Sequence, residues 1–279
     1  MLIDTHAHIN FKAFREDGDE VIKRALDNNV WLINVGAEFK TSKRAVEYAK
    51  KRNQGVFAAV GLHPIHLKTQ TISGKLLGES IGFDVKEEEF DYEKYKALAQ
   101  EPKVVAIGEI GLDYYRRNEK REMSNEQKEK QRETFIKQLE LAQEVNKPII
   151  IHCREAYQDL LEILKTENLK QKTNLKGVIH SFLGNCREAR EYRRLGFKIG
   201  FNGIITFTRD YDEVILETPL KDILLETDCP YLTPVPYRGK RNEPLYVAEV
   251  AKKLAEIKNL ELKEVIEQTF KNAREVFNI

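Results

Sequence analysis

Six side chains with nitrogen or oxygen donor atoms stand where short apolar runs end. His6 and His8 form an HxH pair that closes the first run, residues 2–5. Because side chains two apart on a strand point to the same face, we expect these two imidazoles to converge on one point. The other four donors end later runs: Glu109 in GEIGLD, His152 in IIIHCR, His180 in GVIHSF and Asp228 in LLETDCP.

These six side chains indicate metal chemistry. A single histidine at a strand end is more often a hydrogen-bonded structural residue. Four histidines and two carboxylates together, with no thiolate, suit Zn, Mn or Mg. The set is too large for one tetrahedral ion, and we predict two ions about 3.5 to 4 Å apart that polarise a phosphoryl group and share a hydroxide.

The order of the donors along the chain suggests how they divide. Glu109 comes from a strand in the middle of the predicted sheet, so we assign it as the bridge between the ions. His6, His8 and Asp228 then flank one ion. His152 and His180 hold the other. Asp228 is also our candidate general base, since an anionic side chain beside the attacking water accepts its proton.

The donors need a scaffold that gathers strand ends, and the hydrophobic pattern predicts one. Apolar runs occur at residues 2–5, 31–35, 56–60, 104–107, 149–151, 177–179, 197–199 and 223–225. Continuous runs of this kind indicate strands covered on both faces, and amphipathic helical segments separate them. Eight strands alternating with helices favour a closed parallel α/β barrel, the TIM-type (β/α)8 fold, whose strands all open on one catalytic face. Two extra helices, about residues 244–257 and 262–277, follow the last strand.

One domain spanning residues 1–279 is expected, because a single barrel takes roughly 250 residues. No repeat or Gly/Ser linker interrupts the pattern. One irregular stretch, roughly residues 68–92, contains three glycines and an acidic run. We interpret it as an excursion beside the site, since long loops in compact domains are usually functional or disordered.

The composition limits the partners and the compartment. The 46 basic and 45 acidic side chains nearly cancel, so a polyanion has to be bound by a local patch. For a nucleic acid, binding of an end or a short single strand is therefore favoured over tracking of a long duplex. Three cysteines far apart, and no apolar stretch near the roughly 20 residues of a membrane helix, predict a cytoplasmic protein without a membrane partner. The oligomeric state leaves no mark in the sequence.

Several side chains near the strand ends are candidates for substrate contacts. Phosphate groups bind cationic side chains, and guanidinium groups suit them best. The candidates are Arg154 after His152, the residues Arg238, Lys240 and Arg241 after the eighth strand, and Arg116 and Arg117 after GLDYY. Tyr114, Tyr115 and Tyr237 either stack on bases or pack against neighbouring loops. Asp113 either orients a ligand or water or makes a local loop bond.

Other residues near the motifs have structural interpretations. Cys153 and Cys229 adjoin predicted donors but point to the opposite strand face, so we expect core thiols. Asn242 and Glu243 position the RGKRNEP loop, or Glu243 simply begins the next helix. His66, just after GLHP, is expected to be structural.

Seven motifs occur in one order across most of the chain: HxH, GLHP, GEIGLDY, HCR, H-x-F-x-G, ETDCPYL and PYRGKRNEP. Together they resemble the TatD family of metal-dependent deoxyribonucleases. The resemblance implies an amidohydrolase-type barrel, hydrolysis of phosphodiester bonds in DNA and one or two divalent ions, with Mg commonly supporting activity. It implies the ligands His6, His8, Glu109, His152, His180 and Asp228. His63, in GLHP, matches a histidine that contacts the substrate phosphate and so acts in catalysis. The stretches at residues 68–92 and 116–122 depart from a minimal member and put the preferred substrate length in doubt.

Two other functions compete with the nuclease. The same barrel and HxH pattern serve hydrolases of small-molecule esters, amides or lactones, many of which use a carboxylated lysine as the bridge, where this chain has Glu109. A non-enzymatic alternative is a structural metal site whose basic loops bind nucleic acid. Structural sites are usually closed by four ligands, whereas this set leaves room for water.

Overall fold

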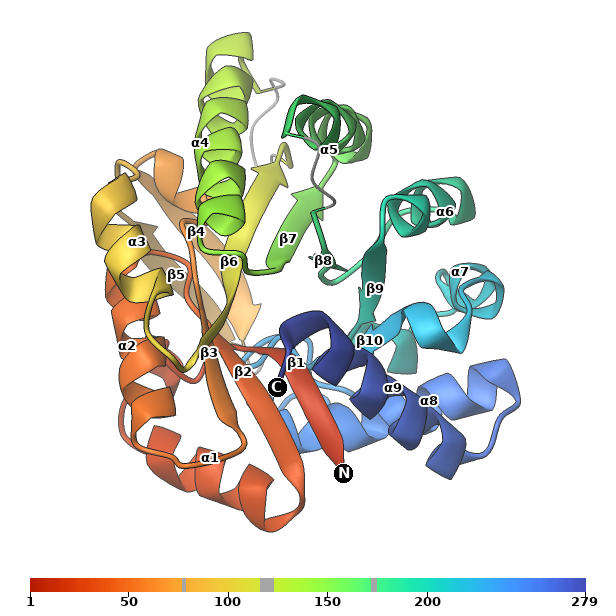
Figure 1. Ribbon diagram of the computed structural model, residues 1–279. Helices are drawn as coiled ribbons and strands as arrows, with labels where there is room; N and C mark the ends of the chain where they lie inside the picture. The colour runs from red at the N-terminus through yellow and green to blue at the C-terminus, as the bar shows by residue number, and fades with distance from the viewer. Residues whose placement is uncertain (77–78, 116–122, 172–174) are drawn as a thin grey trace.

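Eight parallel strands form the centre of the molecule, and the computed structural model describes residues 1–76, 79–115, 123–171 and 175–279. Their hydrogen-bonded order is β1-β2-β3-β6-β7-β8-β9-β10. The strands are β1 (Leu2–Ala7), β2 (Val30–Val35), β3 (Val56–Val60), β6 (Val104–Asp113), β7 (Ile149–Arg154), β8 (Gly177–Ile179), β9 (Phe197–Phe201) and β10 (Ile223–Leu225). They curve into a nearly closed barrel (Figure 1), which confirms the predicted TIM-type fold.

The barrel closes at a seam between its first and last strands. Ala7 and Cys229 form a parallel bridge, and the His8 N–H donates to the Cys229 carbonyl at 2.9 Å. Below this bridge the carboxylate of Asp4, which has no exposed surface, accepts bonds from the Thr227 N–H at 2.8 Å and hydroxyl at 2.6 Å. The two ends of the barrel sheet are thereby joined beside three of the predicted donors.

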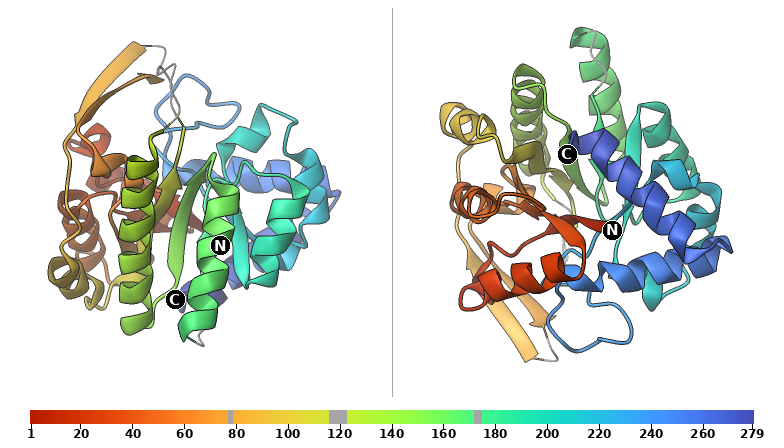
Figure 2. Two further views of the ribbon diagram at one scale, coloured as in Figure 1. Left: turned by 90° about the horizontal axis from the view of Figure 1, so that it is seen from above. Right: turned by 60° about the horizontal axis from the view of Figure 1, so that its bottom comes forward.

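Helices surround the barrel (Figures 1 and 2). They are α1 (Gly18–Asp27), α2 (Phe39–Lys50), α3 (Tyr92–Ala99), α4 (Asn125–Glu144), α5 (Tyr157–Gln171), α6 (Cys186–Arg194), α7 (Asp212–Glu217), α8 (Val247–Lys258) and α9 (Leu262–Phe277). The last two match the predicted C-terminal helices, although the first turn, Pro244–Tyr246, is a 3₁₀ helix. Phe277 of α9 packs with barrel residues such as Ile3 and Ile150, so α9 covers the end of the barrel opposite the strand C-termini.

The stretch at residues 68–92 differs from its predicted irregular form. Gln70–Leu76 (β4) and Glu79–Val85 (β5) pair as antiparallel strands, in register from Gln70↔Val85 to Leu76↔Glu79. Gly74 and Gly82 lie within the ladder and do not break it. The hairpin projects from the barrel at the end where the strands terminate (Figure 2, left). Among the described residues, no helix has the length and apolar character needed to cross a membrane.

Candidate metal centre

Glu109 lies at the middle of the candidate site. It comes from β6 and is 5% exposed. Its carboxylate oxygens lie near side-chain nitrogens of His152 (3.0 Å), His6 (3.4 Å), His63 (3.4 Å), His8 (3.6 Å) and His180 (3.7 Å). Five histidines from the ends of four strands, β1, β3, β7 and β8, thus converge on one carboxylate. A bridging ligand needs this central position.

The first predicted trio comes together across the barrel seam. His6 Nε2 and His8 Nε2 are 3.1 Å apart, and Asp228 Oδ1 lies 3.4 Å from His8 Nε2. The Nδ1 of His8 is 2.9 Å from the Val35 carbonyl oxygen. A proton on Nδ1 therefore bonds that carbonyl, which leaves the Nε2 lone pair facing the cluster.

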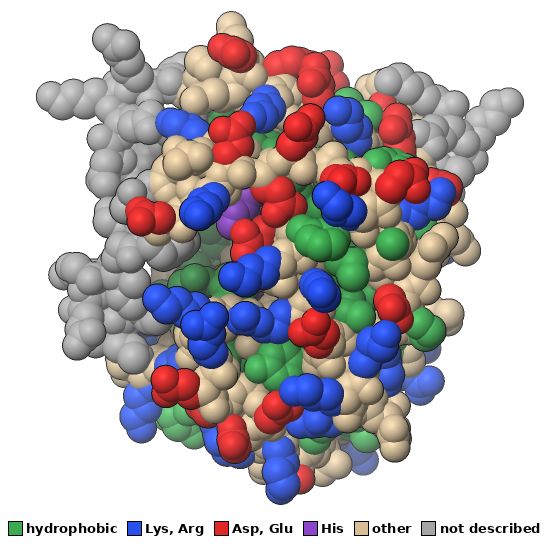
Figure 3. All heavy atoms as spheres, turned by 90° about the vertical axis from the view of Figure 1, so that its left-hand side faces the viewer, with side chains coloured by type: hydrophobic (Ala, Val, Ile, Leu, Met, Phe, Trp, Pro, Cys, Tyr) green, Lys and Arg blue, Asp and Glu red, His purple; other side chains and the backbone are tan. Residues whose placement is uncertain are grey.

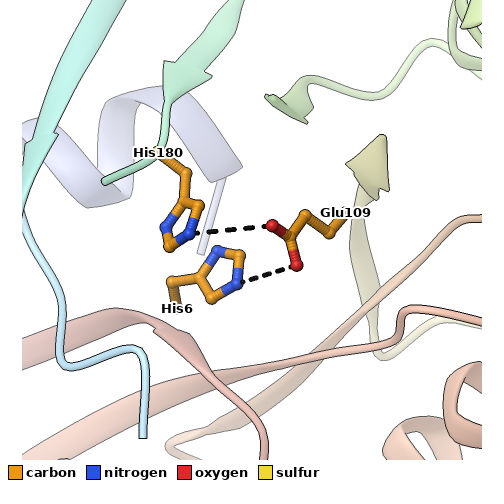
Figure 4. Close-up of side chains that lie close together, drawn as sticks. All are labelled: His6, Glu109 and His180. Carbon is orange, nitrogen blue, oxygen red and sulfur yellow. Dashed lines mark ion pairs between the residues drawn. The ribbon is translucent and has the colours of Figure 1, made fainter. Parts of the chain in front are cut away.

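The remaining histidines form two further groups. His180 joins His6 and Glu109 (Figure 4): its ring stacks on that of His6, with the centroids 3.5 Å apart. His152 groups with Glu109 and His63, and the ring centroids of His63 and His152 are 4.3 Å apart. The assignment of His152 and His180 to one ion stays a prediction.

His63 is oriented as a hydrogen-bond donor. Its Nδ1 accepts the Ile65 N–H at 3.0 Å, so a neutral His63 carries its proton on Nε2, the nitrogen that faces Glu109. A ring in that tautomer offers a proton and not a lone pair to the cluster. This orientation suits the phosphate contact that the sequence suggests for His63, which stays a prediction.

The protonation states of His6 and Glu109 fit a cation site. Burial, together with neighbouring His180, lowers the pKa of His6 to about 4, so His6 is neutral, and within the described parts of the chain its buried Nδ1 has no hydrogen-bond partner. Burial opposes ionisation of Glu109, but neighbouring His63 and His6 hold the pKa of this carboxyl well below its usual range. Neutral imidazoles and ionised carboxylates are the forms that bind divalent ions. Nitrogen and oxygen donors of this kind suit Zn, Mn or Mg.

Two buried carboxylates behind the donors escaped sequence reasoning. Glu226 Oε1 lies 3.0 Å from His180 Nδ1 and accepts the Ser181 N–H at 2.6 Å. Asp4 accepts the His6 N–H at 3.2 Å. Asp4 precedes His6 by two residues in β1 and shares its strand face, and Glu226 precedes Asp228 by two residues just after β10. That spacing was the signal available in the sequence.

Asp113 lies against a predicted ligand. Its Oδ2 is 3.1 Å from His152 Nε2, and its Oδ1 accepts the Tyr115 N–H at 3.0 Å. Burial lowers the pKa of His152, but its bonds with Asp113 and Glu109 raise it to about 10. Asp113 thus contacts His152 directly, and the predicted substrate contact of Asp113 stays a prediction.

The predicted phosphate-binding arginines differ in their exposure and in the side chains they contact. Arg154 is exposed, and its guanidinium carbon lies 3.6 Å from the ring centroid of Tyr115. Arg238 is also exposed and lies 4.0 Å above Phe207. Arg241 instead binds both carboxylate oxygens of Asp17, so a phosphate contact would require that ion pair to open. Arg116 and Arg117 lie outside the described residues.

The neighbouring loop residues are mostly used in packing. The Tyr237 ring stacks on that of Tyr246, with the centroids 4.1 Å apart, and the Tyr114 hydroxyl donates to Asp159 at 2.9 Å. The buried Asn242 amide donates to the Thr227 carbonyl at 2.9 Å, which anchors the RGKRNEP loop. Within the same loop, Glu243 pairs with Arg24 at 2.9 Å and Lys240 lies 5.8 Å from the Tyr237 ring.

The other histidine and the thiols occupy the places expected of structural residues. His66 Nδ1 lies 3.4 Å from the Lys86 carbonyl oxygen and 3.8 Å from Glu38, away from the cluster. Cys153 and Cys229 are buried in the core, where burial raises the pKa of both thiols well above the usual range.

Comparison with known proteins gives one consistent answer. The model of the family described as TatD related DNase matches residues 3–278. The uncharacterized metal-dependent hydrolase YabD of Bacillus subtilis is 39% identical over 100% of both chains. Its counterpart YcfH of Escherichia coli is 32% identical over 100% of this chain and 96% of YcfH. The crystal structure of YjjV, a TatD homologue from Escherichia coli, superposes with a TM-score of 0.83 at 30% identity, covering 100% of this chain and 98% of YjjV. With this barrel and donor cluster, the chain belongs to the TatD family of metal-dependent hydrolases.

Proposed function

We propose that this protein hydrolyses phosphodiester bonds in DNA with the help of divalent metal ions, acting as an exonuclease on ends or short single strands. The observation that carries the proposal is the convergence of five histidines on Glu109 at the open end of the barrel. The family match supports it. The near-neutral net charge of +1 also supports a short or single-stranded substrate over a long duplex.

The donor set would hold one or two divalent ions of Mg, Mn or Zn. The residues proposed to hold them are His6, His8, Glu109, His152, His180 and Asp228. A bound ion would supply Lewis-acid polarisation of a phosphoryl oxygen and a stronger nucleophile at neutral pH.

Other tasks fall to the chain itself. His63 presents a proton on Nε2 and is suited to donate it to a phosphate oxygen. Asp228 is the general base of the proposal, because the nearby histidines lower the pKa of this carboxyl although burial raises it, so the group is ionised. Arg154, exposed beyond His152 on the same strand, is placed to neutralise phosphate charge.

Product analysis on end-labelled DNA tests the proposal. Single and double strands are incubated with Mg, Mn or Zn, with and without a chelator, alongside Glu109→Gln. We expect divalent-dependent release of nucleotides that both the chelator and the substitution abolish. Undiminished cleavage by Glu109→Gln, or in excess chelator, contradicts it.

Parallel assays separate the alternatives. Hydrolysis of amide or lactone substrates without cleavage of DNA would favour the small-molecule hydrolase. DNA that is bound but never cut with any of the three ions would favour a structural metal site. The three cysteines, none in a disulfide, support a reducing cytoplasm as the proposed compartment.

A further inference from the structure

A basic patch lies next to the metal centre, on a part of the surface that no motif includes. We define it by five residues: Lys12, Arg15, Lys40, Lys43 and Arg44. Lys12 lies in the 3₁₀ turn after β1 (Lys12–Phe14), and Arg15 directly follows this turn. The other three residues lie in the first half of α2. Figure 3 shows the face that includes α2, with Lys and Arg side chains gathered on it.

The ion pairing along α2 is uneven. Among the residues the structure describes, no carboxylate forms an ion pair with any of the five side chains. At the other end of the helix Lys50 pairs with Glu101 at 3.1 Å, and Lys51 and Arg52 pair with Asp19 at 3.0 and 2.9 Å. Positive charge is thus neutralised at the end remote from the barrel mouth and left unpaired at the near end.

A few acidic groups accompany the patch without cancelling it. Glu16 and Glu47 are exposed on the same two elements. Glu38, at the start of α2, lies beside His66, and the Glu88 carboxylate accepts the Phe39 N–H at 3.2 Å. Four carboxylates near five cations leave the patch with net positive charge, which attracts a polyanion.

Direct contacts join the patch to the metal centre. The ring of Phe11, at the start of the 3₁₀ turn, stacks on the ring of His8 with the centroids 4.2 Å apart. The Arg44 guanidinium donates to the Asn10 carbonyl at 3.0 Å, and the Asn10 amide donates to the Thr41 carbonyl at 2.9 Å. The turn after β1 therefore lies between the donor cluster and α2 and holds the two together.

We propose that the basic patch binds the phosphates of the nucleic-acid strand on one side of the bond that is cut. This inference rests on the proposed function and adds the path of the strand. Phosphate contacts position a strand without reading its sequence, which suits flexible lysines. A chain with a net charge of +1 needs such a local patch to hold a polyanion.

Paired variants test the inference. Lys40→Gln with Lys43→Gln removes two unpaired charges, and the matched control Lys50→Gln with Lys51→Gln removes two paired charges from the same helix. Binding of a fluorescent single-stranded oligonucleotide is measured by anisotropy in chelator at several salt concentrations. Cleavage is measured with metal for the oligonucleotide and for an unphosphorylated dinucleotide, whose only phosphate belongs to the bond that is cut.

The expected results are specific to the patch variant. The loss of two phosphate contacts makes the plot of log binding constant against log salt concentration shallower by about 1.4. Between about 50 and 200 mM salt, the patch variant therefore loses roughly sevenfold less affinity than the wild-type protein does. The KM for the oligonucleotide rises, while cleavage of the dinucleotide is unchanged. The control keeps the wild-type slope and KM.

Three outcomes overturn the proposal: a wild-type salt slope in the patch variant, equal losses in both variants, or no binding of the oligonucleotide by the wild-type protein. Failure of the proposed function looks different. In that case the oligonucleotide binds in a patch-dependent way, but neither it nor the dinucleotide is cut with any ion.

Discussion

Glu226 Oε1 lies 3.0 Å from His180 Nδ1, and it contacts the ring nitrogen that does not face Glu109. Glu226 has no exposed surface and also accepts the Ser181 N–H. The neighbouring strand makes room for it, because a Cβ at Gly200 would lie 2.6 Å from Glu226 Oε2. A buried carboxylate therefore fixes the orientation of His180 and directs its Nε2 into the cluster.

Replacing this carboxylate is expected to weaken metal binding without removing a ligand. Glu226→Gln keeps the size of the side chain but loses the charge that holds His180. Loss of such an outer partner typically costs about 10- to 100-fold in metal affinity, which titration calorimetry measures. The exposed substitution Glu267→Gln is the control. Equal affinities in wild type and Glu226→Gln would contradict a positioning role.

Gly200→Ala is expected to destabilise the barrel through the same carboxylate. The new methyl group overlaps Glu226 Oε2, and overpacking of this kind costs about 1 to 3 kcal/mol in the free energy of unfolding, measured with denaturant. In the Glu226→Ala background the space is free and the cost should largely disappear. A cost that persists in the double variant would place the strain elsewhere.

Divalent ions are expected to stabilise the fold. An ion that binds only the folded state raises the free energy of unfolding by about 2.7 kcal/mol at 100 times its Kd. Thermal unfolding is followed in chelator and then with Mg, Mn or Zn. Glu109→Gln should reduce the gain, since Glu109 contacts all five clustered histidines. An unchanged midpoint with every ion argues against a site in this cluster.

The thiols are expected to differ in reactivity towards a thiol reagent. Cys153 and Cys229 are buried with raised pKa values, whereas Cys186 is partly exposed. Colorimetric titration of the native protein should therefore detect one reactive thiol, and unfolding should reveal all three. Rapid labelling of Cys153 in the native state would mean that β7 opens easily.

The ion pair between Arg241 and Asp17 predicts a pH-dependent contribution to stability. A hydrogen bond from Arg241 lowers the pKa of Asp17, so the pair stabilises the folded state above the unfolded pKa, and this contribution is lost as the pH falls below about 4. Asp17→Asn should therefore be less stable than wild type at neutral pH, and the difference should shrink in acid. Denaturant unfolding across this range measures it, and a constant difference would contradict the ion-pair explanation.

The sequence predicted the barrel and the gathering of the donors, because each donor directly follows an apolar run and strand ends meet on one face. It did not predict that the His180 ring would stack on His6 or that the His152 ring would contact His63. These contacts depend on how far each side chain reaches, which strand order does not encode. The guanidinium group of Arg241 and its place in the RGKRNEP loop predict a substrate contact, but they do not reveal its ion pair with Asp17, because the two residues lie far apart in the sequence.

The seam of the barrel also sets an order of events during synthesis. His6 and His8 leave the ribosome first, but Asp228 follows the last of the eight barrel strands. The first trio of donors is therefore incomplete until β10 has been translated and docked on β1. A shorter nascent chain cannot assemble this set, so any ion that needs all three donors would bind only after the ring has closed.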